Sequence, residues 1–211
     1  MTRLMASVYE RFMDTTERAC LREWRAALLS SARGEVLEIG AGTGLNLEHY
    51  PSAIERLVVT EPDPHMRAQL DRNVRSRTEN RAVEVSDASA LDLPFDDATF
   101  DTVVSTLVLC SVPNLHQTLG EVHRVLRPGG SFLFLEHVAA AHGTSRRRWQ
   151  GRLEPAWKWV AGGCHLTRET EDAIARSGLV PRDPTRESMR KAPPWVRPTV
   201  RGIAVKPATD A

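Results

Sequence analysis

The sequence lacks the features that mark a membrane-spanning or a secreted protein. No apolar run approaches the ~18 uninterrupted residues that a membrane helix requires. Charged residues stand at positions 10, 11 and 14, where a signal peptide would need its apolar segment. Cysteine is scarce: Cys20, Cys110 and Cys164 lie far apart and form no CxxC pair, which fits a reducing compartment and matches no common zinc spacing. These absences predict a cytoplasmic protein without a metal site.

An excess of charge of one sign is absent as well. Lys and Arg number 28 against 27 Asp and Glu, and the net charge of +1 argues against a dedicated nucleic-acid binder. The balance hides a split, because residues 1–144 hold 14 basic and 20 acidic side chains (−6), whereas residues 145–211 hold 14 and 7 (+7). The basic part is a candidate for contact with an anionic substrate or a lipid surface. With 41% hydrophobic residues, the 211-residue chain suits one domain with an ordinary core.

Short apolar runs alternate with segments of helical periodicity along most of the chain. Strands are expected at residues 36–39, 56–60, 82–85, 100–106 and 131–136, and helices at 7–29, 64–77 and 115–126. A turn at Pro128-Gly129-Gly130 is expected to follow the last of these helices. The tail predicts a helix at 166–177 with Thr167 as N-cap, then closing strands at 179–190 and 199–205. This order predicts an α/β fold: a doubly wound, Rossmann-like sheet of seven mostly parallel strands with a C-terminal antiparallel hairpin.

A glycine-rich turn follows the first expected strand directly. Gly40, Gly42 and Gly44 would let a ligand approach the backbone at the carboxyl end of the strands, where open α/β sheets bind ligands. The turn is not a dinucleotide fingerprint, because that pattern needs glycine at position 45, which is Leu45. No Gly-Lys-Ser/Thr follows, which excludes a phosphate-binding P-loop. A purely structural turn is the alternative explanation.

Acidic residues follow the second and third expected strands. Glu61 lies 17 residues after Gly44, where a carboxylate can accept hydrogen bonds from both hydroxyls of a ribose. Asp87 follows the next strand, where a carboxylate can accept a hydrogen bond from an adenine amino group. Taken singly, each could be a solvated strand-end charge or a capping residue. Together with the glycine turn, they outline an adenosine site without a phosphate cradle.

In their order along the chain these motifs resemble those of the class I S-adenosylmethionine (SAM) methyltransferases. The likeness rests on residues 38–44 (EIGAGTG), Glu61, Asp87 with residues 93–95 (LPF), and residues 127–130 (RPGG), and it covers roughly residues 9–138. The resemblance implies SAM as cofactor, with Glu61 at the ribose and Asp87 at the adenine. The cofactor-binding residues that it implies are Glu38, Gly40, Ala41, Gly42, Gly44, Asn46, Glu61, Pro62, Asp87, Ala88, Thr106 and Leu107.

A narrower likeness covers the tail. Residues 135–138 (LEHV), Trp149, residues 155–157 (PAW), 163–168 (GCHLTR) and the ending 197–206 resemble the alkyl-thiol S-methyltransferases of animal microsomes and their bacterial relatives. This likeness implies methyl transfer to a small, fairly apolar acceptor, above all to a thiol sulfur. The alternatives are N- or C-methylation of a phospholipid head group or a quinone-type ring, and a non-catalytic SAM-binding regulator. The microsomal members begin with a hydrophobic anchoring segment, whereas this chain begins with a charged amphipathic helix, so no stable membrane anchor is expected.

One methyltransferase domain is therefore expected over residues 1–211. Its parts would be a helical lid at 1–33, a SAM-binding core at 34–138 and a substrate-side tail at 139–211. A small-molecule acceptor is the expected partner, and nucleic acid is not. The arginines at 146–148 either begin a solvated helix or make weak contact with a lipid surface. The sequence does not indicate an oligomeric state.

Residues for the acceptor side come from both ends of the chain. His137, at the end of the fifth strand, is the candidate base or orienting group for a thiol, whose pKa near ~8.5 leaves part of it ionised at neutral pH. A histidine that is merely hydrogen-bonded at a strand end is the alternative. Tyr9, Trp157 and His165 are the candidate substrate contacts, with Tyr9 on the helical lid. Zinc binding by Cys164, His165 and His137 is not expected, since their spacing matches no common site.

Overall fold

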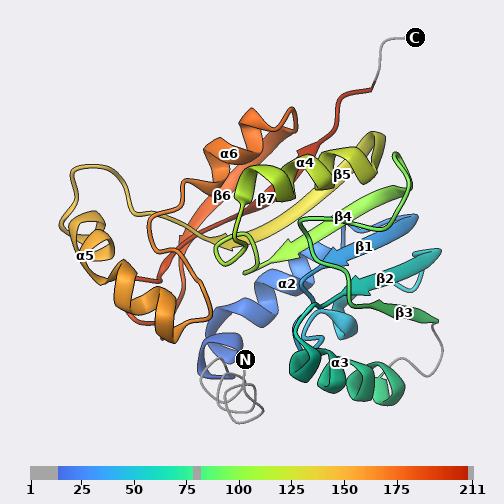
Figure 1. Ribbon diagram of the computed structural model, residues 1–211, viewed down its shortest axis with the longest axis horizontal. Helices are drawn as coiled ribbons and strands as arrows, with labels where there is room; N and C mark the ends of the chain where they lie inside the picture. The colour runs from blue at the N-terminus through green and yellow to red at the C-terminus, as the bar shows by residue number, and fades with distance from the viewer. Residues whose placement is uncertain (1–13, 78–81, 209–211) are drawn as a thin grey trace.

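A computed structural model describes residues 14–77 and 82–208 and shows a seven-stranded sheet with helices on both faces (Figure 1). The strand order is β3-β2-β1-β4-β5-β7-β6. The strands are β1 (Glu35–Ile39), β2 (Arg56–Thr60), β3 (Val83–Ser86), β4 (Phe100–Thr106), β5 (Leu126–His137), β6 (Val180–Ser188) and β7 (Pro198–Val205). The predicted α/β fold with seven strands is confirmed.

The first five strands are parallel, and the last two close the sheet as an antiparallel hairpin. β1 lies between β2 and β4, with β3 and β5 outside them, and β7 pairs with β5 and β6 in antiparallel register. The strand order reverses at β1 and β4, since the chain runs outward to β3 and then returns to the other side of β1. In doubly wound sheets ligands bind at the carboxyl ends of the strands beside such a reversal. The topology therefore directs attention to the loops that follow β1 and β4.

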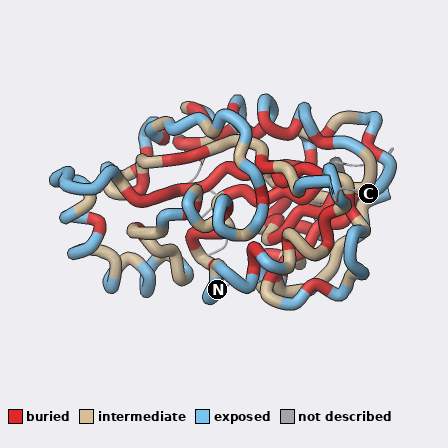
Figure 2. Tube along the Cα trace, turned by 90° about the horizontal axis from the view of Figure 1, so that it is seen from above, coloured by how far each residue is buried: buried red, intermediate tan, exposed pale blue. Residues whose placement is uncertain are grey.

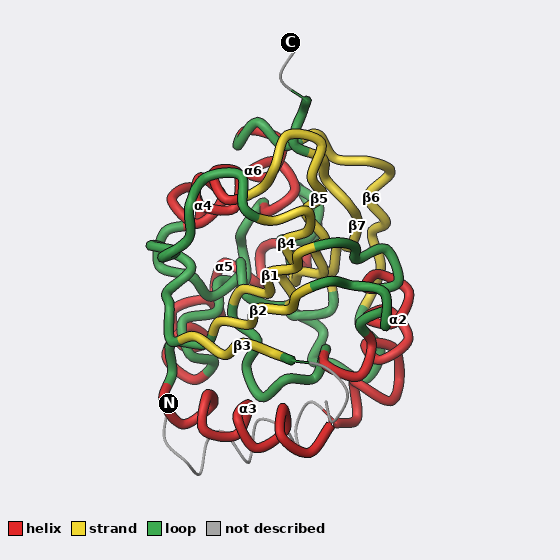
Figure 3. Tube along the Cα trace, turned by 90° about the vertical axis from the view of Figure 1, so that its right-hand side faces the viewer, coloured by secondary structure: helices red, strands yellow, loops and turns green. Residues whose placement is uncertain are grey.

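Helices cover both faces of the sheet (Figure 3). They are a π-helical turn η1 (Glu17–Leu21), α2 (Arg22–Leu29), a 3-10 turn η2 (Leu47–His49), α3 (Pro64–Arg77), α4 (Leu115–Val125), α5 (Ser145–Val160) and α6 (Thr170–Arg176). Successive strand residues point to opposite faces: Val36 packs in one core cluster with Trp24 of α2, and Leu37 in the other with Leu119 of α4. Both faces of the inner strands are thus buried, and β2 and β4 are buried along most of their length. Figure 2 shows the buried chain gathered in the middle of the molecule.

The Pro128-Gly129-Gly130 turn is wrong as a prediction, because these residues belong to β5. Helix α4 does end at Val125, but the chain continues as one strand from residue 126. The pairing of β4 with β5 jumps from Phe100–Leu126 to Thr102–Ser131, so residues 127–130 form a bulge instead of a turn. Two backbone hydrogen bonds stabilise the bulge: the Gly129 N–H donates to the Lys206 carbonyl at 2.9 Å, and the Lys206 N–H donates to the Gly130 carbonyl at 3.0 Å. Tertiary pairing has replaced the local turn.

The predicted N-cap at Thr167 is also wrong. Helix α6 begins at residue 170 with Glu169 at its N-cap position. The Thr167 hydroxyl instead donates to the Glu154 carboxylate of α5, and the neighbouring Arg168 guanidinium donates to the carbonyls of Leu109 and Val112. Arg168 therefore ties the tail to the loop after β4, and Thr167 ties the start of this segment to α5. Of the predicted helix at 7–29, the part from residue 14 onward is helical, and residues 7–13 lie outside the described chain. None of the described helices combines the length and apolar character that a bilayer crossing needs.

Candidate active site

The turn after β1 requires glycine for steric as well as conformational reasons. Gly40, Gly42 and Gly44 have φ angles of +61°, +61° and +88°, which disfavour residues with a side chain. A Cβ on Gly40 would lie 2.7 Å from a γ-carbon of Val108, in the loop after β4. A Cβ on Gly42 would meet only Met66, at 3.6 Å, so the backbone there stays accessible. The turn therefore packs against the loop after β4 at one glycine and is open to a ligand at the next.

The two predicted acids lie side by side at the end of the sheet. Thr60 and Ser86 are register partners in the parallel β2–β3 pair, and Glu61 and Asp87 come directly after them. The Glu61 carboxylate, 8% exposed, accepts hydrogen bonds from the backbone N–H groups of Gly42 and Asp63, both at 2.9 Å. Burial raises the pKa of Glu61, and these two N–H groups partly offset the rise. The exposed Asp87 faces solvent, so the site has one buried and one accessible carboxylate.

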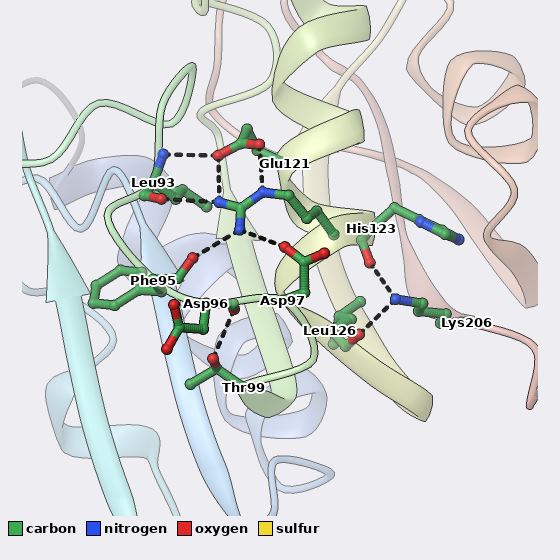
Figure 4. Close-up of polar contacts among 10 residues, drawn as sticks. Leu93, Phe95, Asp96, Asp97, Thr99, Glu121, His123, Leu126 and Lys206 are labelled. Atoms are coloured by element: carbon green, nitrogen blue, oxygen red, sulfur yellow. Dashed lines mark hydrogen bonds and ion pairs between the residues drawn. The ribbon is translucent and has the colours of Figure 1, made fainter.

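The Arg124 guanidinium makes several hydrogen bonds to the loop that follows Asp87 (Figure 4). Arg124 of α4 donates to the carbonyls of Leu93 and Phe95 at 2.9 and 2.7 Å, and to the carboxylates of Glu121 and Asp97. The Glu121 carboxylate in turn accepts the Leu93 N–H at 2.8 Å. These hydrogen bonds to backbone atoms fix the loop beside residues 87 and 88 to the body of the domain.

A buried polar network joins the glycine turn to the end of β4. Glu38 accepts hydrogen bonds from Asn46 at 2.8 Å and from the Tyr50 hydroxyl at 2.7 Å, and burial raises the pKa of its carboxyl. Asn46 also donates to Thr106 at 3.0 Å, and Arg25 of α2 donates to both, at 2.9 and 2.8 Å. Glu38, Asn46 and Thr106 are three of the cofactor-binding residues that the sequence predicts, and the structure brings them together.

Sequence reasoning missed Arg25, which is 5% exposed and also forms an ion pair with Glu17. The periodicity of this helix does predict a buried side chain at position 25. Leu21, Trp24 and Leu28 mark the buried stripe of this helix, and a residue four positions after Leu21 falls on the same stripe. A charged side chain at such a position needs a buried partner.

On the acceptor side, the structure gathers part of what the sequence suggested. The His137 side chain is 2% exposed, with Nδ1 at 3.9 Å from Cys164 Sγ and with Nε2 paired to no described residue. His165 is held by the Glu154 carboxylate at 3.0 Å, and its backbone N–H donates to the Cys110 carbonyl. Trp157 packs edge-on against Trp195 at 6.0 Å. Trp149 and Trp159 are 56% and 87% exposed, so the four tail tryptophans do not form one pocket. Tyr9 lies outside the described residues.

Two cysteines and a histidine from distant parts of the chain meet next to the end of β5. The Sγ atoms of Cys110 and Cys164 and a ring nitrogen of His137 lie within 4.8 Å of one another. The closeness of the two thiols lowers the pKa of Cys164, helped by His137 and Trp157, and raises the pKa of Cys110. The structure thus holds two cysteine side chains together beside a buried imidazole.

Glu136, which directly precedes His137, accepts hydrogen bonds from the end of β4 and from the loop after it. Its carboxyl is fully buried, and burial raises its pKa to about 7. It accepts hydrogen bonds from Ser105 at 2.7 Å and from the Val108 N–H at 3.2 Å. Leu107, between them, has φ of +60° and donates its N–H to the Leu135 carbonyl. A strained backbone residue thus joins the predicted cofactor side of this loop to the cysteine side.

A cavity of about 470 Å³ lies elsewhere, between residues 138–146 and the β6–β7 hairpin. None of the predicted site residues lines it. The candidate active site is therefore the carboxyl edge of β1 to β5, where the glycine turn, the paired acids and the cysteine–histidine cluster follow one another.

Comparison with known proteins agrees with this arrangement. A family model described as a methyltransferase domain matches residues 37–134, the segment from β1 to β5. The chain is 37% identical over 206 residues to the human thiol S-methyltransferase TMT1A, covering 94% of this chain and 82% of the relative. The chain belongs to the thiol S-methyltransferase family. The family expected from the sequence motifs is thereby confirmed.

Solved structures show the same fold with several chemistries. The [4+2]-cyclase SpnF superposes on this chain with a TM-score of 0.71 at 19% identity, covering 90% of this chain and 80% of SpnF. Geranyl diphosphate C-methyltransferase from Streptomyces coelicolor, solved with S-adenosyl-L-homocysteine, gives a TM-score of 0.67 at 15% identity, covering 87% and 76%. At these identities the likeness concerns the fold, and the reaction must be argued from the site.

Proposed function

We propose that this protein is a SAM-dependent methyltransferase that methylates the sulfur of a small, fairly apolar thiol. The observation that carries the proposal is the placement of Glu61, whose buried carboxylate lies one hydrogen bond from the glycine turn at the carboxyl edge of a doubly wound sheet. The identity to a human thiol S-methyltransferase over 94% of the chain supports sulfur as the acceptor atom.

SAM would supply an electrophilic methyl carbon bound to a positively charged sulfur. Glu61 would exchange its backbone partners for the ribose hydroxyls, and Asp87 with the Ala88 amide would bind the adenine. Room at Gly42, where an added Cβ would be 3.6 Å from its nearest neighbour, supports this fit. Pro62 follows Glu61 directly and would line the same side of the nucleoside.

The amino-acid end of the cofactor belongs, in this proposal, to the buried network at Arg25. Arg25, Asn46 and Thr106 are linked by hydrogen bonds of 2.8–3.0 Å, and they lie between the glycine turn and the end of β4. A guanidinium there is suited to a carboxylate, which it can bind in a bidentate manner. Glu38 would act indirectly, because its carboxylate orients Asn46.

Methyl transfer from a sulfonium to a thiolate consumes one positive and one negative charge, so the protein need do little beyond aligning the reactants and excluding water. Trp157 and His137, beside the two cysteines, supply an apolar wall and a buried imidazole. The unpaired Nε2 of His137 supports its role as a group that orients the acceptor or takes its proton.

Calorimetry with SAM tests the cofactor site. Glu61→Ala should weaken binding by roughly 10- to 100-fold, because the lost hydrogen bonds to a charged group are worth ~1.5–3 kcal/mol. Asp87→Ala should have a smaller effect, since its side chain is exposed. Glu55→Ala, at an exposed position before β2, is the matched control and should bind as the wild type does. A wild-type protein without SAM affinity rejects the proposal.

Product analysis with labelled SAM tests the acceptor. A panel of alkyl thiols should accept the label, with S-adenosylhomocysteine formed in equal amount. Turnover also excludes a purely regulatory SAM-binding protein. If a thiol panel and a lipid extract are offered together and only lipid is labelled, the thiol acceptor is wrong.

A lipid acceptor is the second candidate, and the surface of α5 favours it. Trp149 and Trp159 are exposed by 56% and 87%, and the helix begins with three consecutive arginines at 146–148. Exposed tryptophan beside basic residues is suited to the surface of an anionic membrane. A phospholipid head group would then reach the site from the bilayer surface.

A further inference from the structure

The side chains of Cys110, His137 and Cys164 lie close together in the structure, although they are far apart in the sequence. They come from the loop after β4, the end of β5 and the loop between α5 and α6, and each donor atom lies within 4.8 Å of the other two. Cys110 is 4% and His137 2% exposed, and Cys164 is partly buried. Thiolate and imidazole are the ligand types that zinc prefers, and a Cys₂His set leaves one of four tetrahedral positions open.

We propose that Cys110, His137 and Cys164 form a binding site for a soft divalent metal ion, of the Zn²⁺ class, with an open fourth position. The proposal departs from the expectation of no metal site, which rested on spacing along the chain.

The geometry needs only a small adjustment to bind metal. Bond lengths of ~2.3 Å to sulfur and ~2.0 Å to nitrogen place tetrahedral ligand atoms ~3.5–3.8 Å apart. The Cys164 Sγ to His137 Nδ1 distance is already 3.9 Å, and the widest separation within the group is at most 4.8 Å, so closure requires movements of ~1 Å. Gly162 and Gly163 directly precede Cys164 with φ of +60° and +92°, so the backbone of this loop has the freedom to move.

The surroundings suit a cation with thiolate ligands. Two thiols buried together cannot both ionise without a compensating positive charge. The half-exposed Arg168 guanidinium supplies part of that charge, and it is held nearby by the carbonyls of Leu109 and Val112. A divalent ion would allow both thiols to ionise and would fix the loop after β4 to the tail.

The open position gives the metal a role, and this part rests on the proposed function. An acceptor thiol would lose its proton to solvent and occupy the fourth position as a thiolate. Its sulfur lone pair would then attack the methyl carbon of SAM, the bond from that carbon to the sulfonium sulfur would break, and S-adenosylhomocysteine would leave with the electron pair. The thioether product is neutral and a weaker ligand, so it would leave. No atom changes oxidation state. His137 would bind the metal through Nδ1, the ring nitrogen that already faces Cys164.

Titration of the reduced, metal-free protein with Co²⁺ tests the site without SAM or a thiol substrate. The wild type should bind one equivalent and show thiolate-to-cobalt charge transfer in the near ultraviolet with the visible bands of a four-coordinate ion. Cys110→Ser and Cys164→Ser should each lose affinity by ~100-fold or more. Cys20→Ser is the matched control, because Cys20 is buried against Arg190 outside the cluster, and it should bind as the wild type does. Absence of the charge-transfer band in the wild type, or its persistence in both cluster variants, overturns the proposal.

A second measurement needs no substitution and therefore no assumption about folding of the variants. Alkylation of the native chain by iodoacetamide, read for each cysteine by mass spectrometry, should slow at Cys110 and Cys164 when Zn²⁺ is present and should not change at Cys20. Equal rates with and without Zn²⁺ at both cluster cysteines contradict the proposal. Since neither experiment involves methyl transfer, a protein that binds metal but does not methylate thiols would refute the proposed function alone.

Discussion

The contact between Gly40 and Val108 yields a prediction whose size follows from the structure. In Gly40→Ala, the new residue would keep a φ of +61°, which costs an alanine ~1–2 kcal/mol. Its Cβ would also lie 2.7 and 2.8 Å from the two γ-carbons of Val108, and overpacking of this kind costs ~1–3 kcal/mol. We expect the free energy of unfolding to fall by ~2–5 kcal/mol, which corresponds to a melting temperature lower by roughly 5–15 °C.

A double-mutant cycle separates the two contributions. Val108→Ala removes both γ-carbons, so the double variant should recover the overpacking part while the backbone strain remains, giving a coupling of ~1–3 kcal/mol. Urea denaturation of the wild type, both single variants and the double variant measures this coupling. Gly120→Ala is the control, because nothing lies within 4 Å of its added Cβ in the exposed face of α4, and it should stabilise the protein by ~0.5–1 kcal/mol.

Additive effects of Gly40→Ala and Val108→Ala would refute the steric argument. A Gly40→Ala variant as stable as Gly120→Ala would refute both parts of it. The prediction also has a functional side, because Val108 stands two residues before Cys110. SAM affinity measured on the same four proteins should follow the displacement of this loop, with the double variant binding better than Gly40→Ala alone.

Three further predictions concern separate parts of the molecule. Arg25→Met should lower the free energy of unfolding by ~3 kcal/mol and weaken SAM binding, whereas the exposed Arg22→Met should change stability by less than ~0.5 kcal/mol, as urea denaturation with calorimetry would show. Asp101 is partly desolvated, but the Glu35 N–H and Arg127 outweigh this and lower its pKa, so the stability it contributes is present above pH ~4 and is lost as the pH falls further. Asp101→Asn should therefore make the melting temperature depend less on pH between about pH 5 and 3, and an unchanged pH profile would contradict the assignment. Trp159→Ser should reduce sedimentation with anionic vesicles if α5 meets lipid, and equal sedimentation would exclude that contact.

The regular part of the fold was accessible from local patterns. Strands 56–60 and 100–106 and helix 64–77 have the bounds that the sequence predicts. Each strand has β-branched valines at its centre, and the helix begins with proline in its first turn. Errors arose where a distant partner outweighed a local preference. Pro128-Gly129-Gly130 became a bulge because Lys206 pairs with its backbone, and Thr167 left its predicted cap position for Glu154.

The candidate site divides in the same way. Local pattern suffices to predict the glycine turn and the acids after β2 and β3, because strand ends of a parallel sheet meet at one edge. Tertiary packing alone brings Arg25 to this edge from α2, and it joins Cys110, His137 and Cys164 although each lies 27 positions from the next. The hydrophobic pattern along a sequence indicates the periodicity of a single helix or strand. The meeting of side chains from three loops depends on how sheet and helices pack, and no local spacing encodes it.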